Sequence, residues 1–223
     1  MKAPVVDYRS FRPSRINEPQ YRHLKLWLTW LVYFALYFIT ENLIPAERCH
    51  AMHCALDDII PFCEWFLIPY AGWYLLIVFS LLYFTLYDVE SFKRLQVYIF
   101  ITQLVAMAVY IIYPSRQDLR PLVFERDNLL TRIIGIIYAF DTNTGVCPSL
   151  HVAYSLGIAS VWLKKKDASV VWKVILVIFV IAICMATAFV KQHSVVDILW
   201  ALPLGALAEV LTFHVIYRKK PET

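Results

Sequence analysis

The stretch VWKVILVIFVIAICMATAFV, from Val171 to Val190, is followed directly by KQHSVVD, from Lys191 to Asp197. A helix rises about 1.5 Å per residue, so an apolar run of this length spans the roughly 30 Å hydrocarbon core of a bilayer. The stretch therefore predicts a membrane-crossing helix that ends at a polar motif. Ionisable side chains are costly at the border of the hydrocarbon, which makes this motif a candidate functional site.

Similar apolar runs recur along the chain, in which 60% of the 223 residues are hydrophobic and 16% are aromatic. No run alternates apolar and polar residues with the period of two that is typical of a membrane barrel, so helices are expected. Residues 1–223 are predicted to form one all-α polytopic membrane domain. About six crossings are expected, at Leu24 to Leu43, Phe66 to Leu86, Leu95 to Tyr113, Ser149 to Leu163, Val171 to Val190 and Val195 to Tyr217.

Basic residues indicate the orientation, because cytoplasmic loops carry an excess of Lys and Arg. Four basic clusters fall on one side of the predicted crossings: Arg9 to Lys25, Lys93-Arg94, Lys164 to Lys166 and Arg218 to Lys220. We therefore expect cytoplasmic termini, with 1–23 as a basic cytoplasmic segment, and a polar motif on the extracytoplasmic side of the plasma membrane. No cleavable signal peptide is evident. The net charge of +4 then reflects topology and does not indicate nucleic-acid binding.

Within the polar motif, His193 and Asp197 are four residues apart and share one helical face. A carboxylate one turn away can accept the proton of one imidazole nitrogen, which leaves the other nitrogen as a nucleophile. The alternative is an interfacial histidine beside a capping or solvated aspartate.

A second motif, CPSLH from Cys147 to His151, opens the fourth predicted crossing. The run from Ser149 to Leu163 extends only roughly 22 Å at the usual rise, so His151 is expected below the outer surface, where it could protonate a leaving group. Pro148 and the free amides of the first turn favour an anion site, to which Ser149 adds a hydroxyl. The alternative is that Pro-Ser is simply a common helix start.

Three basic residues near the motifs are candidate phosphate ligands. Arg116 and Arg120 lie in the loop after the third predicted crossing, and Lys191 stands two residues before His193. Guanidinium groups can bind phosphate oxygens in pairs and neutralise developing charge, and a lysine adds a point charge. Each of these residues, taken singly, is also typical of a solvated interfacial anchor.

The first outer loop contains Cys49, His50, His53 and Cys54. The two cysteines could form a disulfide in an oxidising compartment, or all four residues could bind a metal ion. The remaining alternative is free thiols.

These residues resemble the three motifs of the type 2 phosphatidic acid phosphatase superfamily, which comprises membrane lipid-phosphate phosphatases and phosphotransferases. Arg120-Pro121 resembles the end of the first motif, Pro148 to His151 resembles the second, and His193 with Asp197 resembles the third. The order and separation are those of the family. The resemblance runs from about the third predicted crossing to the sixth, and the six-helix layout extends it to most of the chain.

The resemblance implies a role for each matched residue. His193 would attack phosphorus and Asp197 would orient it, while His151 would protonate the leaving group and then activate water or another acceptor. Ser149 and Arg120 would hold the phosphoryl oxygens. This scheme implies an enzyme that hydrolyses a lipid phosphate or diphosphate with no metal and no other cofactor.

The chain also departs from the family pattern. Tyr113 stands where the first motif has a lysine, Ala186-Thr187 stands where the third has Ser-Arg, and Leu150 replaces a glycine. Lys191-Gln192-His193 and the Pro-Ser-Leu-His form are more similar to the branch of the inositol phosphorylceramide synthases, in which Arg116 and Lys191 would replace the lost cations. Two alternatives follow: transfer of a phospho-head group between lipids, as in inositol phosphorylceramide or sphingomyelin synthases, and a lipid transporter with a disabled site.

The expected partners are a membrane lipid and the bilayer itself. Asp57 and Asp58 in the first outer loop could contact a hydroxyl or amine of a head group, or they could form only an acidic outer surface. The sequence leaves open which lipid is bound, whether water or an alcohol accepts the phosphoryl group, and the oligomeric state.

Overall fold

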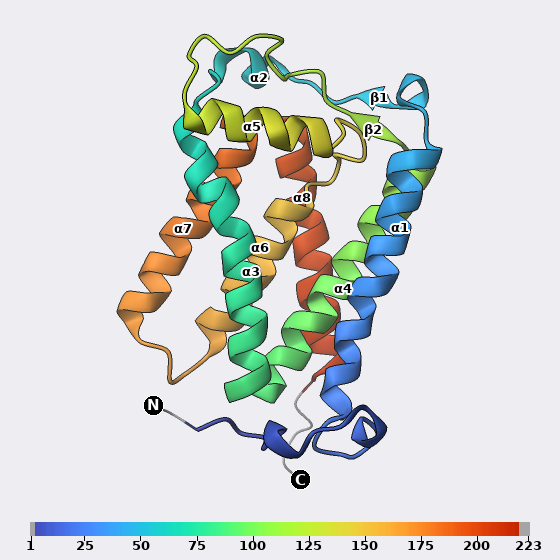
Figure 1. Cartoon of the computed structure of the whole chain (residues 1–223), viewed down its shortest axis with the longest axis vertical. Helices are drawn as coiled ribbons and strands as arrows, with labels where there is room; N and C mark the ends of the chain where they lie inside the picture. Colours follow the sequence, from blue (N-terminus) through green and yellow to red (C-terminus); the bar gives the residue numbers. More distant parts are fainter. Residues whose placement is uncertain (1–2, 219–223) are drawn as a thin grey trace.

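The computed structural model describes residues 3–218, which are mostly helical with very little strand (Figure 1). The α-helices of this range are α1 (Thr29–Leu43), α2 (Ala55–Ile59), α3 (Leu67–Tyr87), α4 (Val89–Ile112), α5 (Leu129–Phe140), α6 (Leu150–Lys164), α7 (Val170–Phe189) and α8 (Val195–Glu209). Two short strands, β1 (His50–Ala51) and β2 (Ser115–Arg116), pair in parallel. Single 3₁₀ turns cover Tyr8–Ser10, Pro13–Arg15, Ala46–Arg48 and Glu64–Phe66; a longer 3₁₀ segment, Arg22–Leu28, precedes α1, and a π-helical segment, Val210–Ile216, continues α8.

Five helical segments of the described range are long and apolar enough to cross a membrane: Arg22–Asn42, Glu64–Tyr87, Val89–Ile112, Val170–Phe189 and Val195–Ile216. They coincide with five of the six predicted crossings, which confirms the all-α polytopic class. The other predicted crossing is α6, whose 15 residues are fewer than the roughly 20 that span a bilayer. It lies in the middle of the bundle, against α3, α4, α7 and α8 (Figure 1).

A close approach of α4 and α6 places this short helix in the core. A Cβ atom built on Gly157 of α6 would lie 2.3 Å from the Cδ1 atom of Tyr98 in α4, so only a glycine fits there. The Tyr98 hydroxyl passes α6 and donates a hydrogen bond of 3.1 Å to the carbonyl of Gly205 in α8. One aromatic side chain therefore joins three helices of the bundle.

Both ends of the described chain lie at the same end of the bundle (Figure 1). Tyr8 donates a hydrogen bond of 2.7 Å to the carbonyl of Thr85 at the end of α3, and Arg94 lies over the ring of Tyr217. The basic clusters thus gather at one end, as the sequence predicts, although Lys219 and Lys220 lie outside the described residues. Which compartment faces that end stays a prediction.

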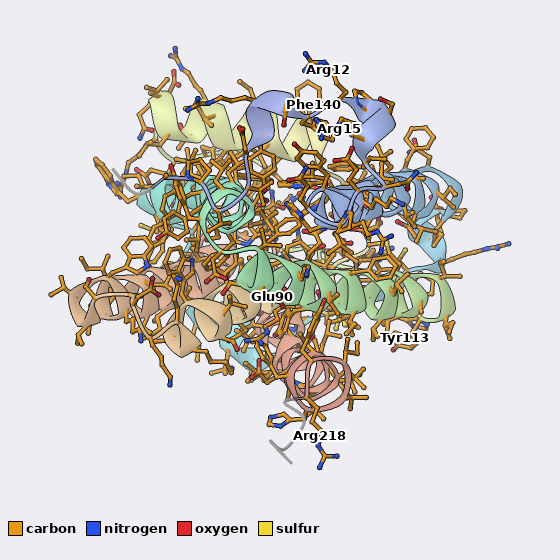
Figure 2. The ribbon with its side chains drawn as sticks, turned by 90° about the horizontal axis from the view of Figure 1, so that it is seen from below. Arg12, Arg15, Glu90, Tyr113, Phe140 and Arg218 are labelled. Atoms are coloured by element: carbon orange, nitrogen blue, oxygen red, sulfur yellow. The ribbon has the colours of Figure 1, made fainter. Side chains whose placement is uncertain are left out.

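The opposite end is covered by α2, α5 and the two strands (Figure 1). No helix was predicted between the third and fourth crossings, yet α5 forms there. Asn128 begins it with a capping box, because its side chain accepts from the N–H of Thr131 and its own N–H donates to the Thr131 hydroxyl. Seen along the bundle, α5 lies on one side and α8 on the opposite side (Figure 2).

Asp57 connects this outer cover to α8. Its carboxylate accepts hydrogen bonds of 2.8 Å from the N–H of Cys54, 2.6 Å from the hydroxyl of Ser194 and 2.8 Å from the N–H of Val195. Burial raises the pKa of this carboxyl, but these hydrogen bonds outweigh burial and hold the pKa below its ordinary value. One side chain therefore caps α2 and α8 together.

Replacing Asp57 with asparagine should lower the thermal stability of the protein in detergent. An amide offers one acceptor oxygen, so at least one buried N–H loses its partner, at a cost of about 1–3 kcal/mol. We expect the melting temperature to fall by several degrees in scanning fluorimetry. Asp58→Asn is the matched control, because Asp58 is exposed and pairs only with His53 at the surface; equal melting temperatures for the two variants would contradict the double cap.

Candidate active site

The loop between α7 and α8 holds His193 in a fixed position. Lys191 adopts the left-handed conformation that ends many helices, with φ of 53°. The carbonyl of Thr187 in α7 accepts hydrogen bonds of 3.0 Å from the N–H groups of both Gln192 and His193. Ser194 then caps the first turn of α8. His193 is thus tied to the end of one helix and precedes the start of the next.

Asp197, in the first turn of α8, fixes the imidazole of His193. Its Oδ2 lies 3.2 Å from His193 Nδ1 and accepts a hydrogen bond of 3.0 Å from the N–H of Ser194. The same carboxylate therefore caps the helix and orients the histidine, so the two alternative roles inferred from sequence coexist. Because an ionised carboxylate only accepts, Nδ1 carries the proton and Nε2 presents its lone pair.

His151, in the first turn of α6, faces that lone pair. Its Nδ1 lies 3.3 Å from His193 Nε2. The His151 ring stacks on Tyr70, with centroids 4.8 Å apart, and packs against Trp73 at 4.1 Å. Its Nε2 has no hydrogen-bond partner in the described part of the chain. The structure therefore brings the three predicted reacting residues together in a single row.

Ser149 lies directly behind this row. Its N–H donates a hydrogen bond of 3.0 Å to the main-chain carbonyl of Asp197, and the preceding carbonyl, of Pro148, accepts one of 2.7 Å from the Tyr110 hydroxyl. The Ser149 side chain is fully buried, and among residues 3–218 its hydroxyl has no partner. A buried hydroxyl without a partner therefore lies at the start of α6, two residues before His151.

Two of the predicted phosphate ligands serve other groups. Arg116, in β2, donates to the carbonyl of Ala46 and to the carboxylate of Asp118, both at 3.0 Å. The Lys191 ammonium donates to two carbonyl oxygens at the carboxyl end of α2, at 2.9 and 2.5 Å, and burial lowers its pKa. Helix ends attract such cations, since their last carbonyls lack partners.

Arg120 lies behind the site, at the carboxyl end of α5. Its guanidinium donates to the carbonyls of Tyr138, Asp141 and Thr142 at 2.8 to 3.2 Å and stacks over the Tyr138 ring. Burial lowers the pKa of this arginine. Most of its donors are therefore used to end α5.

The remaining contact of Arg120 orients Gln192. A guanidinium nitrogen donates a hydrogen bond of 2.6 Å to Gln192 Oε1. Because arginine can only donate, the amide oxygen must face it, and the amide nitrogen must face away. That nitrogen has no partner in the described range, although Gln192 is only 3% exposed. Arg120 thereby presents a neutral donor beside His193.

A cavity of about 690 Å³ includes the two histidines and Gln192 in its wall. It is lined by α1 and α3 along its sides, with residues of α4 and α6 behind. Aromatic side chains contribute much of its surface, among them Trp27, Trp30, Tyr33, Tyr37, Trp73 and Tyr74. The cavity fits a ligand with a long apolar part and one polar end.

The charged lining of this cavity is acidic apart from the histidines. Glu41 and Asp141 contribute carboxylates, and no lysine or arginine of the described range lines it. The predicted acidic contacts of a head group, Asp57 and Asp58, do not line it either: Asp57 caps two helices and Asp58 pairs with His53 at 2.8 Å.

The first outer loop carries free thiols. Cys49 and Cys54 are not joined by a disulfide and are free thiols, which was one of the three alternatives for this loop. His50 stacks on Tyr113 instead, with ring centroids 4.1 Å apart. Among residues 3–218, no three His, Cys, Asp or Glu side chains are grouped as metal ligands.

No protein-family model, curated protein or solved structure matches this chain. The resemblance to the phosphatase superfamily rests on the motif residues quoted above.

The positions of Gln192, Glu41 and Asp141 in the cavity wall were not predicted from the sequence, and neither was the aromatic shelf that Tyr70 and Trp73 form against His151. A signal for the shelf was present, since Tyr70 and Trp73 are three residues apart and share a helical face. Gln192 lies within the polar motif, but its orientation depends on Arg120, 72 residues away. Glu41 and Asp141 come from other segments, and nothing local distinguishes them from surface polar residues.

The tautomer of His193 can be tested by ¹⁵N NMR of the histidine-labelled protein in detergent micelles at mildly alkaline pH. We expect Nδ1 of His193 to be protonated and Nε2 to be unprotonated, with the His193→Gln spectrum identifying the signals. Asp197→Asn should increase the share of the opposite tautomer, because it replaces a charged acceptor with an amide. A wild-type spectrum with a protonated Nε2 would rule out the proposed orientation.

Proposed function

We propose that this chain is an integral-membrane lipid phosphatase that hydrolyses a lipid phosphate or diphosphate through a phosphohistidine, at the extracytoplasmic face of the membrane. The row of Asp197, His193 and His151, with contacts of 3.2 and 3.3 Å, is the observation that carries this proposal. It supplies an oriented nucleophile with a second imidazole on its reactive side, as covalent phosphoryl transfer requires. The apolar cavity suits a substrate whose tail stays in the bilayer.

The first half-reaction forms a bond between His193 Nε2 and phosphorus while the bond to the leaving oxygen breaks. His151 gives a proton to that oxygen, and Asp197 stabilises the charge that develops on His193. In the second half, His151 takes a proton from water, and the water oxygen attacks phosphorus and releases His193. A phosphorus atom cannot lie between nitrogens 3.3 Å apart, so substrate binding replaces the contact between the imidazoles.

The phosphoryl oxygens meet mainly neutral donors in this site. The amide of Gln192, next to His193, and the hydroxyl of Ser149, two residues before His151, are donors without a partner in the described range, and Arg120 donates to the Gln192 oxygen. In the family pattern, cations stand at the positions of Tyr113 and Thr187. Neutral donors serve a singly charged phosphate better than a doubly charged one, because each charge in an apolar site needs its own compensation.

This lack of cations in the cavity wall favours a second candidate function, transfer of a phospho-head group from one lipid to the hydroxyl of another. A phosphodiester carries a single negative charge on its phosphate. In this reaction the acceptor hydroxyl takes the place of water in the second half-reaction, and a tailed acceptor can use the same apolar cavity. A transporter would not need the row of Asp197, His193 and His151, which supports an enzyme.

His193→Gln should abolish turnover, by about 10³-fold or more, because it removes the nucleophile. The measurement is incubation of purified protein with a panel of lipid phosphates and phospholipids, following free phosphate and new lipid products together. Free phosphate indicates a phosphatase, whereas a new phospholipid that needs an added acceptor indicates a transferase.

With a lipid substrate whose leaving group needs no acid, His151→Gln should accumulate a phosphorylated protein, since the second half-reaction loses its base. Intact-protein mass spectrometry at alkaline pH measures this species, which EDTA should not affect. If the phosphorylated protein still formed in His193→Gln, or if that variant kept full turnover, His193 would be excluded as the nucleophile.

Gln192→Glu should lower kcat/KM by about 10²-fold, since it places an anion where the amide donor faces the phosphate. The carboxylate still accepts from Arg120, so the melting temperature should not fall. Gln192→Ala, which removes the donor without adding charge, should lower kcat/KM by about tenfold. Wild-type kcat/KM for the glutamate variant would remove Gln192 from the site.

A further inference from the structure

The outer part of the cavity contains two carboxylates, Glu41 and Asp141, whose nearest cation, Arg120, interacts with them only at longer range and lies outside the cavity wall. Glu41, near the end of α1, accepts a hydrogen bond from the Thr142 hydroxyl. Asp141, just after α5, accepts one of 2.8 Å from the Tyr37 hydroxyl. Neither forms an ion pair with a residue of the described range. Partly buried carboxylates near one another are costly, and a cation between them offsets that cost.

Aromatic rings surround the same part of the cavity. Tyr33 and Tyr37 follow each other along α1 with centroids 5.9 Å apart, and Trp30 meets Tyr33 edge to face at 5.9 Å. Tyr74 faces them from α3 in the opposite wall. Ring faces attract ammonium groups, and quaternary ones in particular, because these have little hydration to lose. Carboxylates together with aromatic faces are therefore complementary to an organic cation.

This acidic pair lies next to the donor for the phosphate. One guanidinium, that of Arg120, contacts the carbonyls of Asp141 and Thr142 and also Gln192 Oε1. The buried Gln192 amide nitrogen, which lacks a partner in the described range, calls for an acceptor such as a phosphoryl oxygen. The cavity thus presents a hydrogen-bond donor for a ligand oxygen next to two carboxylates that attract a ligand cation, and most of the remaining wall is apolar.

We propose that Glu41 and Asp141 bind the ammonium group of a zwitterionic phospholipid, whose amine is joined to the phosphate by a short alcohol. This inference rests on the proposed phosphohistidine chemistry for the position of the phosphate, applied to a phosphodiester as in the second candidate function. A zwitterionic head group presents one negative charge to Gln192 and His193 and one positive charge to the acids. It also matches a cavity wall without lysine or arginine, whereas an anionic head group would meet two carboxylates of its own sign.

Turnover selectivity tests the proposal. Phosphatidylcholine, phosphatidylethanolamine, phosphatidylglycerol and phosphatidate with identical acyl chains are presented to the full-length protein in maltoside micelles. We expect kcat/KM to be at least tenfold higher for the two amine lipids than for the two anionic ones. In Glu41→Gln and Asp141→Asn, the ratio of phosphatidylcholine to phosphatidylglycerol should fall at least tenfold. Asp58→Asn, an exposed acid of the same end, should keep the wild-type ratio.

A binding measurement separates this inference from the proposed reaction. In His193→Gln, short-chain phosphatidylcholine and phosphatidylglycerol are titrated while the fluorescence of the cavity tryptophans, Trp30 and Trp73 among them, is followed. Tighter binding of the amine lipid, lost in the added Glu41→Gln change, would support the ammonium site even if no lipid were turned over. Turnover or binding without preference for the amine lipids, or equal losses for all lipids in the acid variants, would overturn it.

Discussion

The site depends on how backbone amides are satisfied where α7 ends and α8 begins. In an apolar surrounding each of these N–H groups needs an acceptor from the protein. The Thr187 carbonyl takes two of them, Asp197 takes that of Ser194, and Asp57 takes that of Val195. The same acceptors position His193 between the two helices. The hydrogen bonds that satisfy the backbone at this helix break therefore also set the position of His193.

Long-range features of the fold were predictable to the extent that they follow from apolar runs. Five crossings and the pairing of His193 with Asp197 could be inferred, because length and i,i+4 spacing are local properties of the sequence. His151 lies 42 residues from His193, and its place beside them was expected only from the family resemblance. The fate of the cations could not be inferred. Lys191 and Arg120 donate to carbonyls at the ends of α2 and α5, and no helix was predicted where α5 forms. Carbonyl groups at helix ends compete with phosphate for a basic side chain. Where the helix ends are not known from the sequence, a basic residue near a motif is wrongly expected to bind phosphate.

The basic and acidic side chains near the polar end of the cavity differ in whether they line its wall. Arg120 is kept out of the cavity wall and acts on it through the Gln192 amide, while Glu41 and Asp141 enter the wall directly. The distant origins of these residues, in the first crossing, the α5 loop and the α7–α8 loop, explain why no sequence window contained the pattern.

The contact between His151 and His193 has a thermodynamic consequence. His193 Nε2 lies 3.3 Å from His151 Nδ1, so a phosphate that binds His193 as proposed has to displace His151 from this contact. The free energy for that displacement has to come from the ligand's other contacts. A soluble ester offers only a head group, whereas a tailed molecule also removes apolar surface from water, at about 25 cal/mol per Å². The free energy needed to displace the contact between His151 and His193 would then discriminate against soluble esters. This discrimination would not depend on how wide the cavity mouth is.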